Sequence, residues 1–466
     1  MILGIVGRTV DVFLITCLVV GYALSWGVTR TAWLYVRHRH AGLQRERDML
    51  SADLPPDGAL PAVLVQIPTF NEGALIWRAL AAATALDWPR DRLQVQVLDD
   101  SDDESAEIAR SAVHEFQRRG HRVTLIQRTA RAGFKAGALK AGLARSHEPF
   151  VAIFDVDYVP RPDFLRLCMR PLLADPALAF VQARCDFLNG TANRLTRAQQ
   201  VMLDGNFGAE QATRSWTNQI LPFNGTCGLW RSAAIEAAGG WQGDTLTEDL
   251  DLSYRAQMAG WRAVYLVSVA VPGELPVTVD AWNTQQRRWN KGFAQTARKL
   301  LPAIWRGKSS WTRKAEATLH FGGCFAGIVA TGTAIFLAVD WLLGTMSYAI
   351  VLPLVGFGLL KGCVDVVALQ IASRNLLQSV LSVRPPTTLW KTCAQVLAAN
   401  ATYERYKLMM GLDVLRALRG GDALFERTPK TAAVAYELAD AGGAAATPAE
   451  IDRPRLNAGG PGFDTV

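Results

Sequence analysis

The chain has 466 residues, half of them hydrophobic, and carries a formal net charge of +7. This length allows more than one domain. Much of the positive charge lies beside hydrophobic segments, where it would meet anionic lipid headgroups, so it does not indicate binding to nucleic acid. The seven cysteines show no Cys-x-x-Cys spacing. They therefore indicate neither a zinc site nor a disulfide framework, but reduced thiols in the cytosol.

The first hydrophobic segment lies near the N-terminus. Residues 12–28 carry no charged side chain, and their number is about the minimum for a membrane span. Arg30, Arg37 and Arg39 follow this segment. A basic flank on this side favours a retained anchor over a cleaved signal peptide, with the following chain in the cytoplasm.

Two further hydrophobic segments predict membrane spans. Residues 319–339 contain no Asp, Glu, Lys or Arg. In residues 347–372, the charged side chains are Lys361 and Asp365. These two residues are four apart, on one helical face, where they can neutralise each other. Residues 389–412 are interrupted by charges and fit an amphipathic or re-entrant helix as well as another span. The number of spans stays open between three and five.

Between the hydrophobic segments the chain alternates strand and helix patterns. Buried-strand patterns occur at residues 62–67, 93–98, 123–127 and 150–154, and helix patterns lie between them, for example at 104–119. This alternation predicts an α/β fold with a mostly parallel sheet. We expect five regions: an anchor with a basic connector (1–50), the α/β domain (51–262), interfacial helices (263–315), membrane-associated helices (316–415) and a mostly disordered cytosolic tail (416–466).

Acidic pairs follow two of the predicted strands. Asp99 and Asp100 come directly after one strand, and Asp155 and Asp157 follow another. An open α/β sheet binds its ligand at these strand ends. For Asp99 and Asp100, a turn with a helix cap would explain the same residues.

The second pair points to a divalent cation. Asp155 and Asp157 are separated by one residue, so both carboxylates can face one site. Without a cation, two such carboxylates would repel each other. A Mg²⁺ or Mn²⁺ ion that bridges them to a diphosphate removes this repulsion and supplies a Lewis acid.

Three further groups have both a functional and an ordinary explanation. Lys135 lies in a loop rich in Gly and Ala that leads into a helix, where it can approach phosphate or be a surface lysine. Glu248 and Asp249 at a helix start are either capping residues or a candidate base. Arg288 and Trp289 can bind a diphosphate and stack on a sugar, or they can mark an interfacial amphipathic helix.

Taken in order, these motifs resemble the processive family 2 glycosyltransferases, the group of cellulose synthase, chitin synthase and hyaluronan synthase. Finer details are similar to the cellulose-synthase-like glucomannan (mannan) synthases. They are the segments Pro-Thr-Phe-Asn-Glu at 68–72, Lys-Ala-Gly-Ala-Leu at 135–139, Phe-Asn-Gly-Thr-Cys-Gly at 223–228 and Phe-Glu-Arg-Thr-Pro-Lys at 425–430. The resemblance implies a GT-A type, Rossmann-like nucleotide-sugar domain joined to transmembrane helices.

The resemblance also implies a role for each matching residue. The donor nucleotide and its diphosphate would be bound by Thr69, Glu72, Asp99 or Asp100, Lys135 and Arg288. The metal ion would be held by Asp155 and Asp157. The general base would be Asp249, with Glu248 as the next candidate. The acceptor would be bound by Asn224, Gly225, Cys227, Gln285 and Trp289.

The function implied is an inverting transfer of a hexose from GDP-mannose or UDP-glucose to a growing β-linked mannan, glucomannan or glucan. The alternative is a non-processive β-glycosyltransferase that makes a glycolipid or a polyprenyl-phosphate sugar. Asn290-Lys291-Gly292 differs from the plant mannan synthases and leaves the donor sugar open, and the membrane region is short for a secretion channel. A non-catalytic scaffold would be expected to lack some carboxylates, and all are present. We expect an integral protein of a bacterial inner or plasma membrane, with its catalytic domain in the cytoplasm.

Overall fold

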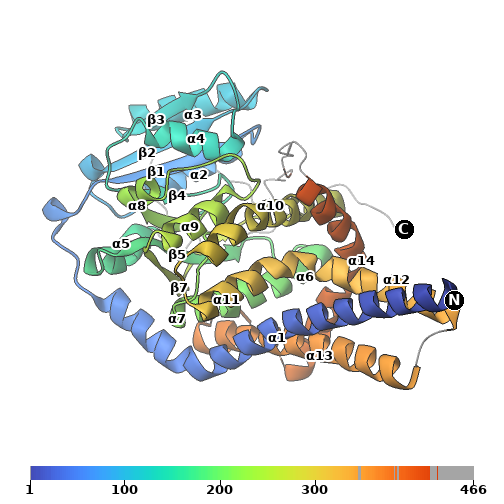
Figure 1. The fold of residues 1–466 in the computed structure, drawn as a ribbon. Helices are drawn as coiled ribbons and strands as arrows, with labels where there is room; N and C mark the ends of the chain where they lie inside the picture. The colour runs from blue at the N-terminus through green and yellow to red at the C-terminus, as the bar shows by residue number, and fades with distance from the viewer. Residues whose placement is uncertain (1, 345–347, 383, 386–387, 420–427, 429–466) are drawn as a thin grey trace.

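The computed structural model describes residues 2–344, 348–382, 384–385, 388–419 and 428. It contains an α/β domain and a bundle of long helices that extends away from that domain (Figure 1). Most of the predicted tail at 416–466, including all but one residue of the motif at 425–430, lies outside the described residues.

A mostly parallel sheet of seven strands forms the centre of the α/β domain, in the order β3-β2-β1-β4-β6-β5-β7. The strands are β1 (Val63–Thr69), β2 (Leu93–Asp99), β3 (Val123–Gln127), β4 (Phe150–Ile153), β5 (Leu178–Phe187), β6 (Gly228–Arg231) and β7 (Arg262–Gly273). Only β6 runs antiparallel to its neighbours, β4 and β5. The four strands predicted from the sequence are β1 to β4, and the predicted parallel sheet is confirmed.

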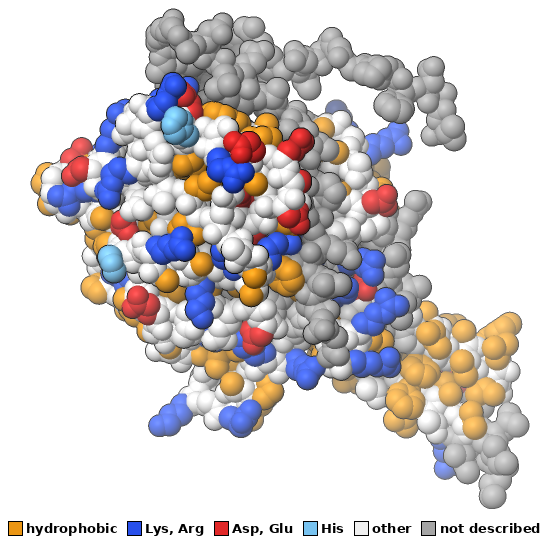
Figure 2. All heavy atoms as spheres, turned by 90° about the horizontal axis from the view of Figure 1, so that it is seen from above, with side chains coloured by type: hydrophobic (Ala, Val, Ile, Leu, Met, Phe, Trp, Pro, Cys, Tyr) orange, Lys and Arg blue, Asp and Glu red, His pale blue; other side chains and the backbone are white. Residues whose placement is uncertain are grey.

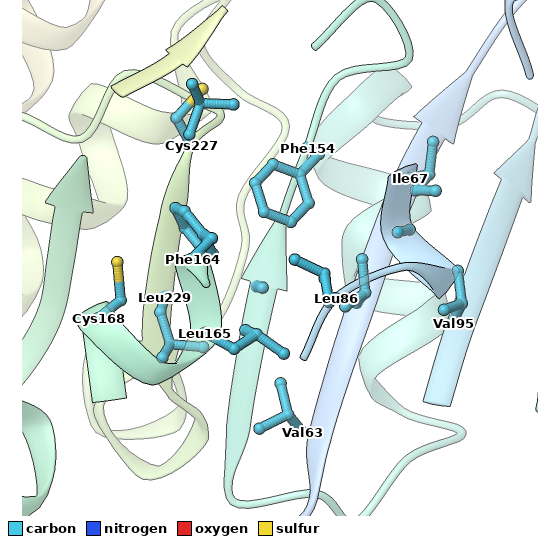
Figure 3. Close-up of a cluster of buried hydrophobic side chains, with 14 of the residues drawn as sticks. Val63, Ile67, Leu86, Val95, Phe154, Phe164, Leu165, Cys168, Cys227 and Leu229 are labelled. Carbon is cyan, nitrogen blue, oxygen red and sulfur yellow. The ribbon is translucent and has the colours of Figure 1, made fainter. Parts of the chain in front are cut away.

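Helices cover both faces of this sheet and bury two hydrophobic cores. They are α2 (Leu75–Thr84), α3 (Ser105–Arg118), α4 (Phe134–Leu143), α5 (Phe164–Ala174), α8 (Ser232–Ala237) and α9 (Glu248–Met258). Because successive strand residues point to opposite faces, β1 contributes Val63 and Ile67 to one core and Leu64 to the other. In the first core, Phe154 and Phe164 pack beside the strand residues (Figure 3), with an edge-to-face contact and ring centroids 4.9 Å apart.

In the part of the chain that the structure describes, three stretches are long and apolar enough to cross a membrane, as judged by length and composition: Val6–Ser51, Trp311–Leu343 and Val351–Gln378. They coincide with the three predicted spans. The helices concerned are α1 (Ile2–Ser51), α11 (Trp311–Gly322), α12 (Ala326–Leu343) and α13 (Tyr348–Asn375). Hydrophobic side chains gather on the protruding end of this bundle, whereas charged ones are scattered over the α/β domain (Figure 2). Val12, Phe13, Trp341 and Leu342 are among the exposed hydrophobic residues.

The ambiguous segment at 389–412 belongs to α14 (Leu389–Arg419). Within the described residues, α14 is not one of the stretches apolar enough to span a membrane. It packs against α6 (Arg194–Asp204) and α10 (Val279–Arg306), and also against α12 and α13 of the bundle. Its Asp413 is buried and accepts hydrogen bonds from the Arg287 guanidinium of α10 at 2.7 and 3.2 Å.

A polar cluster joins α1 to α13 inside the helical bundle. Asp365 accepts hydrogen bonds from Ser25 at 2.9 Å and from Thr29 at 2.7 Å, and it forms an ion pair with Lys361. The predicted neutralisation of Lys361 by Asp365 is therefore confirmed, and α1 adds two hydroxyl groups to it. This cluster satisfies charges that would otherwise be costly among apolar helices.

Two contacts fix the bundle against the α/β domain. A π-helical turn, Gly205–Glu210, connects α6 to α7 (Gln211–Trp216). A Cβ atom at Gly208 would lie 2.1 Å from the hydroxyl of Ser373, so the glycine lets α13 approach this turn. Beyond α13, Arg384 forms ion pairs with Asp186 at 2.6 Å and Asp204 at 2.8 Å, all with little exposure to solvent.

α1 continues from the bundle to the sheet without a break. A Cβ atom at Gly42 would lie 2.3 Å from the ring of Trp216, so the helix packs flush on that ring. Farther along, the buried Glu46 carboxylate accepts a hydrogen bond from the Ser268 backbone N–H at 2.8 Å. The same helix thus contacts the other spans at one end and β7 at the other.

The polar cluster predicts a specific pattern of stability. Asp365→Leu leaves the Lys361 ammonium without its carboxylate, so we expect a loss of about 3 kcal/mol in the free energy of unfolding. The double variant Lys361→Met/Asp365→Leu should recover most of this loss, because no unpaired charge remains. Thermal unfolding of the purified protein in detergent measures both effects. An unchanged midpoint in Asp365→Leu would show that the cluster contributes nothing.

Candidate active site

A cavity of about 1350 Å³ lies where the α/β domain meets the helical bundle. β1 pairs in parallel with β2, with Thr69 opposite Asp99, and also with β4. The loops after these three strands therefore open at one edge of the sheet, where α/β folds bind ligands. Twelve of the residues predicted to form the site line this cavity: Thr69, Glu72, Asp100, Lys135, Asp155, Asp157, Asn224, Glu248, Asp249, Gln285, Arg288 and Trp289.

In the first acidic pair, Asp100 faces the cavity and Asp99 is buried. Asp100 lines the cavity, and its carboxylate is bound by the Arg128 guanidinium, with one hydrogen bond of 2.8 Å. Asp99 is buried and accepts hydrogen bonds from the Ser101 backbone N–H at 3.0 Å and from Gln127 at 2.9 Å. The structure thus brings Asp100 to the cavity and uses Asp99 to hold the end of β2.

Lys135 is one of the cationic residues that line the cavity, and it lies among the acidic ones. Its ammonium donates to Asp155 at 2.6 Å and to the backbone carbonyl of Gly225 at 3.0 Å. Burial opposes the charge on Lys135, but Asp155, Glu248 and Asp249 outweigh this effect and raise its pKa. Lys135 therefore stays protonated and holds the surrounding carboxylates together.

Asp155 and Asp157 present two carboxylates to the cavity. Asp157 is buried and accepts from the Glu274 backbone N–H at 3.3 Å, and the Asp155 backbone N–H donates to the Thr226 hydroxyl at 2.9 Å. Across the described residues, no group of three or more His, Cys, Asp or Glu side chains is arranged to hold a metal ion. Two carboxylates fit Mg²⁺ or Mn²⁺ when a substrate diphosphate and water supply the remaining ligands.

Glu248 and Asp249 begin α9, and both line the cavity. One Asp249 oxygen accepts from the Leu250 backbone N–H at 2.8 Å. Burial, together with the charge of Glu248, raises the pKa of Asp249 to about 7, although Lys135 acts in the opposite direction. Burial also raises the pKa of Glu248, against the effects of Lys135 and Arg288. A carboxyl group with a pKa near neutrality is suited to accept a proton from a substrate.

The segment at 223–228 shapes the wall between these groups. Gly225 has a φ of +75°, and a Cβ atom there would lie 2.8 Å from the Asp249 carboxylate. Asn224 lines the cavity and exchanges two hydrogen bonds with Gln211, at 2.6 and 3.1 Å. Cys227 is fully buried behind this wall, bridges β4 and β5 through its backbone and does not line the cavity.

α10 carries Gln285, Arg288 and Trp289 along another wall of the cavity. The same helix holds the start of α9. Gln295 accepts from the Leu246 backbone N–H at 2.9 Å, and the hydroxyls of Thr296 and Thr247 lie 3.0 Å apart. A Cβ atom at Gly292 would lie 2.5 Å from Thr247, so the glycine permits this close packing. The position of Asp249 is thereby coupled to that of Arg288 and Trp289.

Several residues of the site were not singled out from the sequence. Arg128 directly follows β3, one of the predicted strands, and so carries the same signal as the aspartates. Glu274 follows β7, which lies almost wholly in the region predicted as interfacial helices (263–315), so no predicted strand pointed to it. Arg131 stacks on Phe70, with its guanidinium carbon 3.3 Å from the ring centroid, and both line the cavity. Phe70 lies within the segment at 68–72, and Arg131 lies four positions before the segment at 135–139. Gln211 gave no sequence signal, because its partner Asn224 is brought to it only by the fold.

Comparison with known proteins identifies the family. Residues 61–292 match the family model for glycosyltransferase like family 2. The chain is 45% identical over 252 residues to glucomannan 4-beta-mannosyltransferase 2 of Arabidopsis thaliana, covering 53% of this chain and 47% of the relative. It is 44% identical over 254 residues to glucomannan 4-beta-mannosyltransferase 1 of Oryza sativa subsp. japonica, covering 54% and 49%. The chain therefore spans about half the length of these curated relatives.

A solved structure shares the fold. The mannosyltransferase of Pyrobaculum calidifontis, in complex with GDP-Man and Mn²⁺, matches with a TM-score of 0.50 and 24% identity. The match covers 81% of this chain and 99% of that chain. This likeness, together with the sheet and the three candidate spans, confirms the predicted fold class. The predicted family is confirmed as well: through residues 61–292, the chain belongs to the glycosyltransferase like family 2.

Proposed function

We propose that the protein is an inverting β-mannosyltransferase that uses GDP-mannose and extends a β-linked mannan or glucomannan. The observation that carries this proposal is the arrangement of Lys135, Asp155 and Asp249 around Gly225 in one cavity. The choice of mannose and of a β-linked polymer is supported by the relatives, which are named glucomannan 4-beta-mannosyltransferases.

The donor is bound at the edge of the sheet. Thr69, Glu72 and Asp100 contact the nucleoside, and Lys135 and Arg288 contact the diphosphate, because a guanidinium and an ammonium both bind phosphate oxygens well. Asp155 and Asp157 would hold a Mg²⁺ or Mn²⁺ ion, which supplies a Lewis acid for the departing diphosphate.

The transfer itself is a single displacement. Asp249 removes a proton from an acceptor hydroxyl, and that oxygen forms a bond to the anomeric carbon of mannose. The bond from this carbon to the diphosphate breaks, and its electron pair leaves with the nucleoside diphosphate. One displacement inverts the configuration, so an α-linked donor gives a β-linked product. Trp289, next to the diphosphate-binding Arg288, offers its indole face to the acceptor sugar.

The protein works at a membrane, with its catalytic domain on the cytoplasmic side. The basic residues that follow the first candidate span support this orientation. The bacterial inner membrane expected from the sequence stays a prediction, because the relatives reported above are plant proteins.

The base can be tested by substitution and by pH. Asp249→Asn should bind GDP within a few-fold of wild type but lose transfer by about 10²–10⁴-fold, the usual contribution of a general base. In the wild type, Asp249 must be ionised to act. With a pKa of about 7 in the free enzyme, kcat/KM should level off above that pH and fall by about tenfold per unit below it.

The pH profile and the nucleotide affinity of Asp249→Asn serve as controls. The acidic limb near pH 7 should be missing from the residual activity of this variant. A variant that keeps more than about a tenth of the wild-type rate would show that the base lies elsewhere, and Glu248→Gln would then be measured next.

Metal dependence tests the role of Asp155 and Asp157. Excess EDTA should abolish transfer, and Mg²⁺ or Mn²⁺ should restore it. GDP affinity, measured by calorimetry, should rise when Mn²⁺ is added to the wild type. The increase should be lost in Asp155→Asn and Asp157→Asn, since a neutral amide is a poor ligand for a hard cation. Full transfer in excess chelator would refute this assignment.

Gly225 tests the geometry of the site. Gly225→Ala places a methyl group 2.8 Å from the Asp249 carboxylate, and displacing that group should reduce transfer by about 10²-fold. Gly240→Ala is a matched control, because Gly240 has a similar φ of +71° but nothing within 4 Å of an added Cβ atom. Equal losses in the two variants would point to backbone strain rather than to contact with Asp249.

A further inference from the structure

The cavity does not end at the catalytic residues. It continues between α1, α12 and α13, where it is lined by residues such as Leu18, Gly21, Ala330, Ala334, Leu337 and Val366. We call this part the membrane slot. Asp249 and Leu18 line the same continuous cavity, so the slot connects the proposed base with the apolar helices of the bundle.

The slot is long enough for an extended chain. Thr31 and Cys17 both line the cavity and belong to α1. They are fourteen positions apart in the helix, which at 1.5 Å per residue corresponds to about 21 Å. This is roughly two thirds of the thickness of the hydrocarbon core of a bilayer, about 30 Å.

The chemistry of the slot favours a hydrocarbon over a sugar chain. Its walls are mostly aliphatic, and the described hydroxyl groups in it already donate within the protein. Tyr22 donates to the Leu354 carbonyl at 2.6 Å, Ser25 to Asp365 at 2.9 Å and Thr333 to the Val329 carbonyl at 2.8 Å. A sugar chain would bury many hydroxyl groups here with few partners, whereas a hydrocarbon needs none.

A polar band separates the slot from the catalytic residues. Arg214 lines the cavity and forms ion pairs with Glu210 at 2.9 Å and with Glu316 at 3.3 Å. His320 also lines the cavity and lies 2.6 Å from the hydroxyl of Tyr254, a residue of α9. From one end to the other, the cavity therefore presents an aliphatic part, a charged and hydroxylated part, and then Asp249. This order matches an amphiphilic molecule.

We propose that the first acceptor is a lipid whose hydrocarbon chain lies in the membrane slot. Its hydroxyl group, carried directly or on an attached sugar, reaches Asp249. This inference rests on the proposed function and specifies its acceptor. Asp249 takes the hydroxyl proton, the oxygen bonds to the anomeric carbon of mannose, and the nucleoside diphosphate leaves with the electron pair.

The test compares two acceptors with the full-length protein in lipid nanodiscs. Dodecyl β-mannoside carries a hydrocarbon chain, and methyl β-mannoside does not. Mannose transfer from GDP-mannose should have a kcat/KM at least tenfold higher for the dodecyl compound. Ala330→Phe and Ala334→Phe, which fill the slot, should bring the ratio of the two values close to one.

Ala338→Phe is the matched control. Ala338 is also exposed on α12 but does not line the cavity, so the ratio should stay at its wild-type value. A ratio that stays high in Ala330→Phe and Ala334→Phe overturns the proposal, because the advantage of the dodecyl compound would then come from partition into the bilayer. A wild-type ratio near one, or a ratio lowered equally by all three variants, also overturns it, because the slot would then give no specific advantage. A protein that mannosylates soluble mannooligosaccharides but neither mannoside also overturns it. If no acceptor is mannosylated, the proposed function itself is wrong.

Discussion

The site depends on a balance of charge around one ammonium group. Lys135 lies against Asp155 and the carbonyl of Gly225, with Glu248 and Asp249 close enough to raise its pKa. Without this cation, the three carboxylates, which lie close together in one cavity, would repel one another. With it, the carboxylates stay near one point while burial still keeps the pKa of Asp249 near neutrality. The rest of the fold serves to bring these four side chains together.

These groups come from separate elements of the fold, apart from Glu248 and Asp249, which both begin α9. Asp155 follows the end of β4, Lys135 lies in the first turn of α4, and Asp249 begins α9. Gly225 lies in the loop before β6, the strand that pairs antiparallel with β4. Because β6 runs antiparallel to β4, the loop before β6 lies at the same edge of the sheet as the end of β4. Packing of α10 on the start of α9 then completes the cavity.

Prediction from sequence succeeded where a local pattern determines the structure. The strands β1 to β4 were found because apolar runs end in acidic or turn residues, and the spans because long stretches such as 319–339 lack charge. Prediction was incomplete where partners are distant in the chain. Nothing local indicates that Gln211 exchanges hydrogen bonds with Asn224, or that Arg384 pairs with Asp186 and Asp204. The aspartates at 99 and 100 look alike in sequence, and only the geometry of the fold separates the cavity-lining one from the buried one.

The uninterrupted helix α1 has a mechanical consequence. It is anchored at one end by the cluster at Asp365 and at the other by Glu46 on Ser268 and by Gly42 on Trp216. Because both ends of the helix are held, its length fixes the distance between the helical bundle and the cavity of the α/β domain. Inserting a single residue between the anchors would shift one end by about 1.5 Å and turn it by about 100°. Both anchors could not then be satisfied at once, so the number of residues between them is constrained by the two contacts.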